Sequence, residues 1–190
     1  MRRCYNRAVN ILVIYGSLRE KSINKALARA IERNAPEGML IELMGIGGLP
    51  LYNEDDELTD YPLVAAEAKK KIVAADGVLI VTPEYNRAPP GALKNFLDWT
   101  SRPEDERIWS GKIVGVLGAS NGMRGASFAQ YDIRRIMGYF NAAVLGQPEY
   151  YLAQGDTKIT GGVVSEPKAI EVLKKFLAAF KTFVERGRTA

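Results

Sequence analysis

The chain has no histidine among its 190 residues. This absence excludes Ser-His-Asp and Cys-His catalysis, acid–base chemistry by imidazole, and every metal site with a histidine ligand. The single cysteine, Cys4, excludes an internal disulfide, a CxxC redox pair and a cysteine-rich metal site. No metal is therefore expected, and reactive chemistry would have to come from a bound cofactor that the protein holds, orients and tunes.

Long apolar runs are also missing. No apolar segment approaches the roughly 18 residues of a membrane span. The first apolar run, residues 9–15, continues into a polar loop and not into the small-residue cleavage site of a signal peptide. We therefore expect a cytoplasmic protein that does not contact membranes. With 47% hydrophobic and 25% charged residues, residues 9–190 are expected to form one globular domain.

Excess charge is small and lies at the N-terminus. The formal net charge is +4, and Arg2, Arg3 and Arg7 carry most of the excess. The rest of the chain is nearly neutral, so nucleic acid is not an expected partner. Residues 1–8 are expected to form a flexible basic tail.

Short apolar runs rich in β-formers alternate with longer helical patterns along the chain. Five strand–helix pairs predict a parallel sheet with helices on both faces. We expect an α/β, flavodoxin-like three-layer sandwich with a five-stranded parallel sheet in the order 2-1-3-4-5. This order places a ligand crevice between strands 1 and 3, at their carboxyl ends. The expected strands are 9–15, 39–44, 77–82, 113–118 and one that begins at 144–145 and extends towards Leu152. The expected helices are 24–34, 61–75, 91–100, 124–138 and 166–186.

The loop after the first strand has the features of a phosphate-binding site. Residues 16–24 read Gly-Ser-Leu-Arg-Glu-Lys-Ser-Ile-Asn and lead into an amphipathic helix, whose N-terminal N–H groups and dipole favour an anion. Ser17, Ser22 and Asn24 offer neutral donors, and Arg19 offers a planar charged fork. The dinucleotide and triphosphate fingerprints are absent, so a terminal monophosphate such as that of FMN fits better. The alternative is an ordinary helix start with Ser22 as N-cap.

Two further loops are expected at the same edge of the sheet. In residues 82–96, three prolines and a glycine form a stiff wall, in which the Tyr85 ring and the Asn86 amide can border a flat heteroaromatic ring. The alternative is a long turn that starts the next helix, with Tyr85 packed on the surface. In residues 118–125, small residues permit close backbone approach and an amide-lined anion site.

In this order, the motifs resemble those of the NADPH-dependent FMN reductases of flavodoxin-like fold, especially the bacterial quinone and chromate reductases. The resemblance covers residues 9–185. Gly16-Ser17-x-Arg19-x-x-Ser22-x-Asn24 is similar to the family's phosphate loop, and Pro83-Glu84-Tyr85-Asn86 is similar to its isoalloxazine loop. The resemblance implies FMN as cofactor, bound by Ser17, Arg19, Ser22 and Asn24 at the phosphate, by Pro83, Glu84, Tyr85 and Asn86 at the ring, and by Ser120 and Gly122 in a third loop.

The resemblance also implies the reaction, in which hydride passes from NADPH or NADH to the flavin and electrons pass to quinones, chromate or azo compounds. No side chain is assigned a catalytic acid–base role. It further implies a homo-oligomer, either a dimer or a tetramer, with residues 49–56, Tyr131 and Glu149 as candidate contacts.

Three residues depart from the family's pattern: Asn121 replaces a proline, Ala126 a second glycine, and Arg87 an aromatic or smaller residue. Arg87 is expected close to the exposed flavin face, where it would attract an anionic acceptor or a cofactor phosphate. The alternative is a surface or subunit-contact arginine.

Two other functions remain open on sequence grounds. A flavodoxin-type electron carrier that is not an enzyme would share the fold. Such carriers usually have a strongly acidic face and a Thr-rich phosphate loop, whereas this chain is nearly neutral and has Arg19 in that loop. A binding or regulatory domain without flavin is the third possibility. The enzyme is the preferred interpretation.

Overall fold

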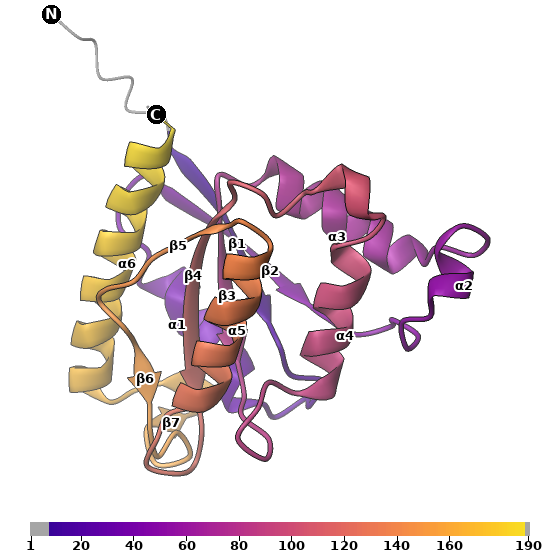
Figure 1. Cartoon of the computed structure of the whole chain (residues 1–190). Helices are drawn as coiled ribbons and strands as arrows, with labels where there is room; N and C mark the ends of the chain where they lie inside the picture. The colour runs from indigo at the N-terminus through magenta and orange to yellow at the C-terminus, as the bar shows by residue number, and fades with distance from the viewer. Residues whose placement is uncertain (1–7, 189–190) are drawn as a thin grey trace, which may run out of the picture.

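A parallel sheet forms the middle layer of the computed structural model, which describes residues 8–188 (Figure 1). Its strands follow the order β2-β1-β3-β4-β5, so the predicted flavodoxin-like topology is confirmed. The expected basic tail lies, apart from Ala8, outside the described residues. The main strands are β1 (Val9–Tyr15), β2 (Met39–Gly45), β3 (Gly77–Thr82) and β4 (Ile113–Ala119).

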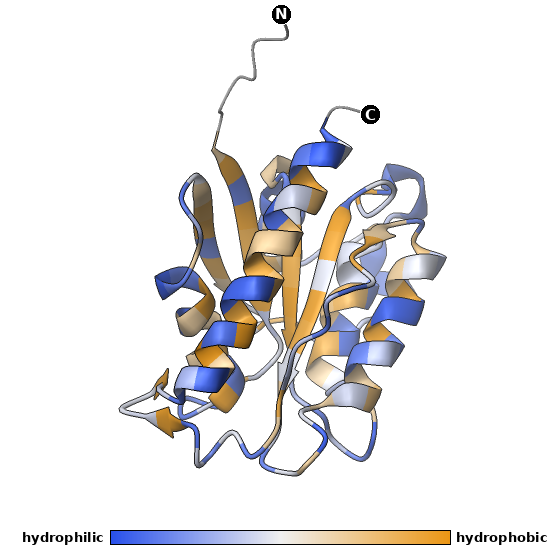
Figure 2. Cartoon of the chain, turned by 90° about the vertical axis from the view of Figure 1, so that its left-hand side faces the viewer, coloured by the Kyte–Doolittle hydropathy of each residue, from blue (hydrophilic) through white to orange (hydrophobic). Residues whose placement is uncertain are grey.

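The two faces of the sheet are covered by different helices. Side chains alternate along β1, so that Ile11 and Val13 face one core while Leu12 and Ile14 face the other. The first core includes α1 (Ile23–Arg33) and α6 (Pro167–Gly187). The second includes α3 (Leu63–Ala74), α4 (Gly91–Thr100) and α5 (Ser127–Tyr139). Figure 2 shows the apolar central strands between these helices. β3 and β4 are buried along their whole length, as strands covered on both faces must be.

The fifth strand differs from the prediction of one strand that begins at 144–145. It is split into β5 (Ala143–Val144), which pairs with the start of β4, and β6 (Tyr151–Leu152), which pairs with the end of β4. The chain leaves the sheet between them, where Pro148 lacks the N–H group that a continuous ladder needs. An antiparallel pair, β7 (Ile159–Thr160) and β8 (Val163–Val164), was not predicted. Its turn is Gly161-Gly162, and both residues have positive φ, as a two-residue hairpin requires.

Two helix starts differ from the prediction by more than one residue. α5 begins at Ser127 and not at residue 124, because Gly125 and Ala126 adopt left-handed conformations with φ of 55° and 64°. α3 begins after Pro62. The short α2 (Glu54–Glu57) and the 3-10 helix η1 (Glu104–Glu106) were not predicted, and Figure 1 shows α2 on a segment that projects from the body. Within residues 8–188, no helix has both the length and the apolar character for a membrane crossing.

Candidate functional site

The three predicted loops meet at the carboxyl edge of the sheet. We call residues 16–22 the first loop, 83–90 the second loop and 120–126 the third loop. The backbone N–H of Gly16 donates to the carbonyl oxygen of Val81 at 2.8 Å, which joins the first loop to the end of β3. A Cβ added to Gly118 would lie 2.6 Å from the carbonyl oxygen of Thr82, so the ends of β3 and β4 are in close backbone contact. The sequence therefore predicted correctly which loops come together.

Asn24 links α1 to the end of β4. Its Nδ2 donates to the carbonyl oxygen of Ala119 at 3.0 Å, and its Oδ1 accepts from the N–H of Ala119 at 2.9 Å. The side chain is almost fully buried. These two bonds use the side-chain oxygen and one of the two amide hydrogens. Asn24 thus sets the position of α1, and with it the first loop, relative to the third loop.

Ser22 is the N-cap of α1, as the alternative interpretation of this segment predicted. Its Oγ accepts from the backbone N–H groups of Asn24 and Lys25, both at 3.2 Å. A hydroxyl that accepts two hydrogen bonds still has its own hydrogen to donate. Capping the helix and binding an anion are therefore compatible roles for Ser22.

The first loop has donors available for a phosphate. Among the described residues, the backbone N–H groups of Leu18, Glu20 and Lys21 make no hydrogen bond. The first turn of α1 carries no acidic side chain. Ser17 is buried, whereas Arg19 is exposed and forms no ion pair within residues 8–188. Free N–H groups, a helix N-terminus and a guanidinium fit the terminal monophosphate of FMN.

The second loop is a tight hairpin turn. The N–H of Tyr85 donates to Ala88 and the N–H of Ala88 donates to Tyr85, both at 3.0 Å. The two central residues, Asn86 and Arg87, have φ of 51° and 68°. Positive φ at both positions is characteristic of a type I′ turn. The start of the loop is buried at Pro83. The turn exposes the side chains of Tyr85, Asn86 and Arg87.

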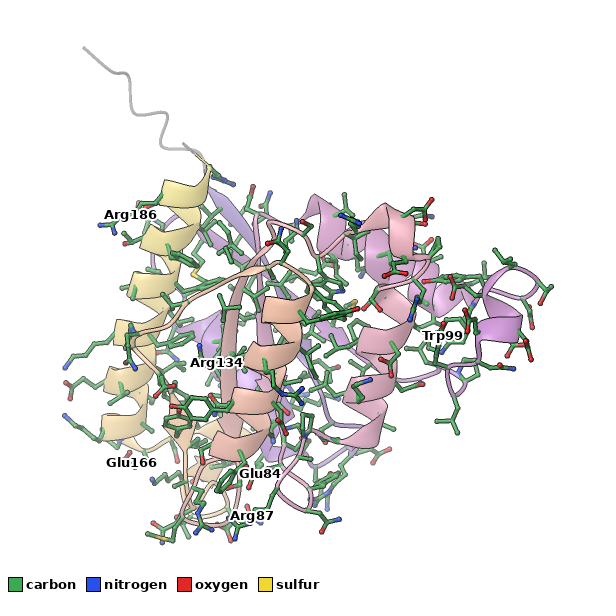
Figure 3. All side chains as sticks on the ribbon, in the orientation of Figure 1. Glu84, Arg87, Trp99, Arg134, Glu166 and Arg186 are labelled. Atoms are coloured by element: carbon green, nitrogen blue, oxygen red, sulfur yellow. The ribbon has the colours of Figure 1, made fainter. Side chains whose placement is uncertain are left out.

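Glu84 caps α5 from the second loop. Its Oε2 accepts from the backbone N–H groups of Phe128 at 2.9 Å and Ala129 at 3.2 Å. Ala126, the residue before the helix, has no side chain that could cap it. The carboxylate therefore meets the positive end of the α5 dipole. Figure 3 shows Glu84 beside the first turn of α5, with Arg87 beyond it at the edge of the molecule.

A fourth segment, residues 151–155, borders the third loop and was not predicted to belong to the site. The N–H of Ser120 donates to Leu152 at 3.1 Å, and the carbonyl oxygen of Gly122 accepts from Gln154 at 3.0 Å. Gly122 itself has open space, since a Cβ there would meet no atom closer than 4.0 Å. The only sequence signal for this segment was the predicted extension of the fifth strand.

Tyr151, which lies beside the third loop, has a strongly raised pKa. Burial raises the pKa of the Tyr151 hydroxyl, and hydrogen bonds with Glu149 and Tyr131 raise it further. The phenol therefore stays neutral throughout the physiological range. It can donate a hydrogen bond there, but it cannot serve as a base.

Two cavities lie away from the three loops. One, of about 790 Å³, lies between α4 and α5 and is lined in part by Trp109 and Tyr139. The other, of about 580 Å³, is lined by residues of α3 and of the segment around Pro103. Neither includes a residue of the three loops. The candidate site is therefore defined by its loops and their donors and not by these cavities.

Comparisons with known proteins agree with the fold and with the resemblance of the loops. The sequence model of the family described as NADPH-dependent FMN reductase matches residues 9–157. A 2-hydroxy-1,4-benzoquinone reductase of a Burkholderia species is 42% identical over 183 residues, which are 95% of this chain and 99% of that protein. An NAD(P)H-dependent FMN reductase of Pseudomonas aeruginosa is 38% identical over 181 residues, 95% of this chain and 97% of that protein.

Among solved structures, the chain is similar to FerB, a flavoenzyme NAD(P)H:(acceptor) oxidoreductase from Paracoccus denitrificans. The TM-score is 0.85 and the identity 34%, over 94% of this chain and 98% of FerB. Both the sequence and the fold are thus shared over nearly the full length. The chain belongs to the NADPH-dependent FMN reductase family and is an oxidoreductase that uses FMN and NAD(P)H.

Proposed function

We propose that this protein is a quinone reductase that holds FMN at the carboxyl edge of its sheet and takes electrons from NAD(P)H. The observation that carries the proposal is the convergence of the three loops, in which the first loop presents unpaired N–H groups and Arg19 at the start of α1. Quinones are proposed as acceptors because the Burkholderia relative is named a benzoquinone reductase.

The first loop would bind the phosphate of FMN. Ser17 and Ser22 each have a hydroxyl hydrogen to donate, and Arg19 provides a guanidinium with a permanent positive charge. Ser22 and Asn24 hold α1 and its N-terminus in place through their own hydrogen bonds. Part of the donor geometry thus exists before the ligand arrives, which lowers the entropic cost of binding.

The second and third loops would border the flavin ring. Pro83, Glu84, Tyr85 and Asn86 lie on the second loop, and Ser120 and Gly122 lie on the third. Bound FMN supplies the redox chemistry, since it can take a hydride from NAD(P)H and reduce an acceptor. The protein's task is to orient the ring and to direct backbone N–H groups at any negative charge that develops on it. No side chain is assigned a catalytic acid–base role.

Several finer features belong to the same proposal. Chromate and azo compounds are proposed as additional acceptors, because electron transfer at an open site needs little recognition of the acceptor. We also propose a homo-oligomer, either a dimer or a tetramer, and a cytoplasmic location, where NAD(P)H is available. Residues 49–56 are a candidate subunit contact, since Leu51 is 84% exposed.

Turnover by the purified protein tests the proposal. The chain is incubated with FMN, freed of unbound flavin by gel filtration, and mixed with NADPH or NADH and 1,4-benzoquinone. Rapid oxidation of NAD(P)H without any partner protein would support the quinone reductase. Bound flavin with no NAD(P)H oxidation would favour the flavodoxin-type carrier, and a protein that retains no flavin absorbance would favour a binding domain.

A further inference from the structure

Phe128, at the start of α5, has two guanidinium groups against its ring. The Cζ atom of Arg87 lies 5.0 Å from the ring centroid and that of Arg124 lies 5.5 Å from it. Both distances are within the range of cation–π attraction. Arg87 comes from the second loop and Arg124 from the third, so the pair stands where these two loops meet.

No carboxylate among residues 8–188 forms an ion pair with Arg87 or Arg124. The nearby Glu84 directs its Oε2 at the backbone N–H groups of Phe128 and Ala129. Asp132, further along α5, pairs with Arg135 at 3.5 Å. Two exposed positive charges therefore remain at the edge of the candidate site.

Arg87 occupies a turn position whose backbone conformation favours glycine. Type I′ turns favour Asn-Gly at their two central positions, and here the pair is Asn86-Arg87, with φ of 68° at Arg87. A side chain other than asparagine or aspartate is disfavoured in this left-handed region. Residues that break a local rule in this way concentrate at functional sites. The turn therefore holds a guanidinium at a conformational cost.

We infer that Arg87 and Arg124 together bind an anionic group of a substrate at the edge of the candidate site, where the second and third loops meet. This inference rests on the proposed function. Guanidinium forks suit phosphate and carboxylate oxygens, and their ring contacts with Phe128 hold them in place without using their N–H donors. Two substrates can supply the anion. One is NADPH, whose 2′-phosphate NADH lacks, and the other is an acceptor that carries a carboxylate.

The variants for the test are Arg87→Gly and Arg124→Gln, with Arg135→Gln as the matched control. Glycine at position 87 suits the turn, so this variant should fold at least as well as the parent protein. The control removes an exposed guanidinium from α5 that already pairs with Asp132. With a neutral quinone as acceptor, the ratio of kcat/KM for NADPH to that for NADH should fall about tenfold in each test variant and stay unchanged in the control.

A binding measurement and a second acceptor complete the test. On the FMN-loaded protein, calorimetry should show that both test variants bind adenosine 2′,5′-bisphosphate about tenfold more weakly, while their affinity for adenosine 5′-monophosphate changes little. If the coenzyme ratio and the bisphosphate affinity do not change, a benzoquinone carrying a carboxylate is compared with its methyl ester. If kcat/KM in the test variants falls for the carboxylate-bearing quinone and not for its methyl ester, the acceptor is the source of the anion.

The inference would be overturned if both test variants matched the parent protein in the coenzyme ratio, in the affinity for the bisphosphate and in the comparison of the two quinones. The proposed function would survive that result as long as the protein still retained FMN and reduced quinones with NAD(P)H. Failure to retain FMN would instead count against the proposed function itself.

Discussion

Asn24 and the backbone of Ala119 form a reciprocal pair of hydrogen bonds, at 3.0 and 2.9 Å, between residues 95 positions apart in the sequence. The pair is buried and joins the first turn of α1 to the end of β4. The first and third loops are therefore held in a fixed relation. A phosphate bound by the first loop and a ring bordered by the third loop would therefore keep one position relative to each other.

Replacing Asn24 by alanine should weaken both the fold and the site. The N–H and carbonyl groups of Ala119 would be left buried without partners, which lowers the free energy of unfolding by about 2–3 kcal/mol. Asn34→Ala is the matched control, since this residue at the other end of α1 makes a partly buried bond to Ala30. It should cost about 0.5–1 kcal/mol. Urea denaturation measures both, and equal losses would show that the Asn24 pair has no special role.

Glu84→Ala should reduce stability by about 1 kcal/mol, because the N–H groups of Phe128 and Ala129 lose their cap. Glu166 caps α6 in the same way, through the N–H groups of Lys168 and Ala169, and Figure 3 shows it at the start of that helix. Glu166→Ala should cost a similar amount. Only Glu84→Ala should also alter the absorbance spectrum of bound flavin. The same spectral change in both variants would contradict a local role for Glu84.

Gly118→Ala should destabilise the sheet where β3 and β4 end. The new Cβ would lie 2.6 Å from the carbonyl oxygen of Thr82, a backbone atom that cannot turn away. We expect a loss of about 1–3 kcal/mol in the free energy of unfolding. Gly138→Ala, on α5 where a Cβ meets no atom within 4 Å, should instead raise stability by about 0.5–1 kcal/mol. Thermal unfolding measures the stability of both variants. A Gly118→Ala variant as stable as the parent protein would refute the close contact between Gly118 and Thr82.

The sequence predicted the features of the fold that follow from local periodicity. β1 and β3 have the predicted bounds, because each is a short apolar run that ends at a loop. The alternation of strands and helices predicted a parallel sheet covered on both faces. The strand order was chosen from the common orders of such sheets, in agreement with the resemblance of the loops, and the structure confirms it. The first loop was predicted to bind a phosphate because short polar side chains and Arg19 stand between a strand and a helix, and that role stays a prediction.

Other features depend on tertiary contacts that no local pattern encodes. Glu84 caps a helix 44 residues away, and the carboxylate alone gives no sign of its partner. The start of α5 was misplaced because Ala126 adopts a left-handed conformation, which alanine rarely does. β5 and β6 have two residues each, too few for a periodic signal.

The relative affinity of FMN and riboflavin tests the role of the first loop most directly, because the two ligands differ only in the terminal phosphate. The measurement compares the parent protein, the double variant Ser17→Ala/Arg19→Ala, and the control Arg33→Ala, which removes a guanidinium from the last turn of α1. The parent and control should prefer FMN by about 100-fold or more, and the double variant by about tenfold or less. An unchanged preference in the double variant would contradict phosphate binding by this loop.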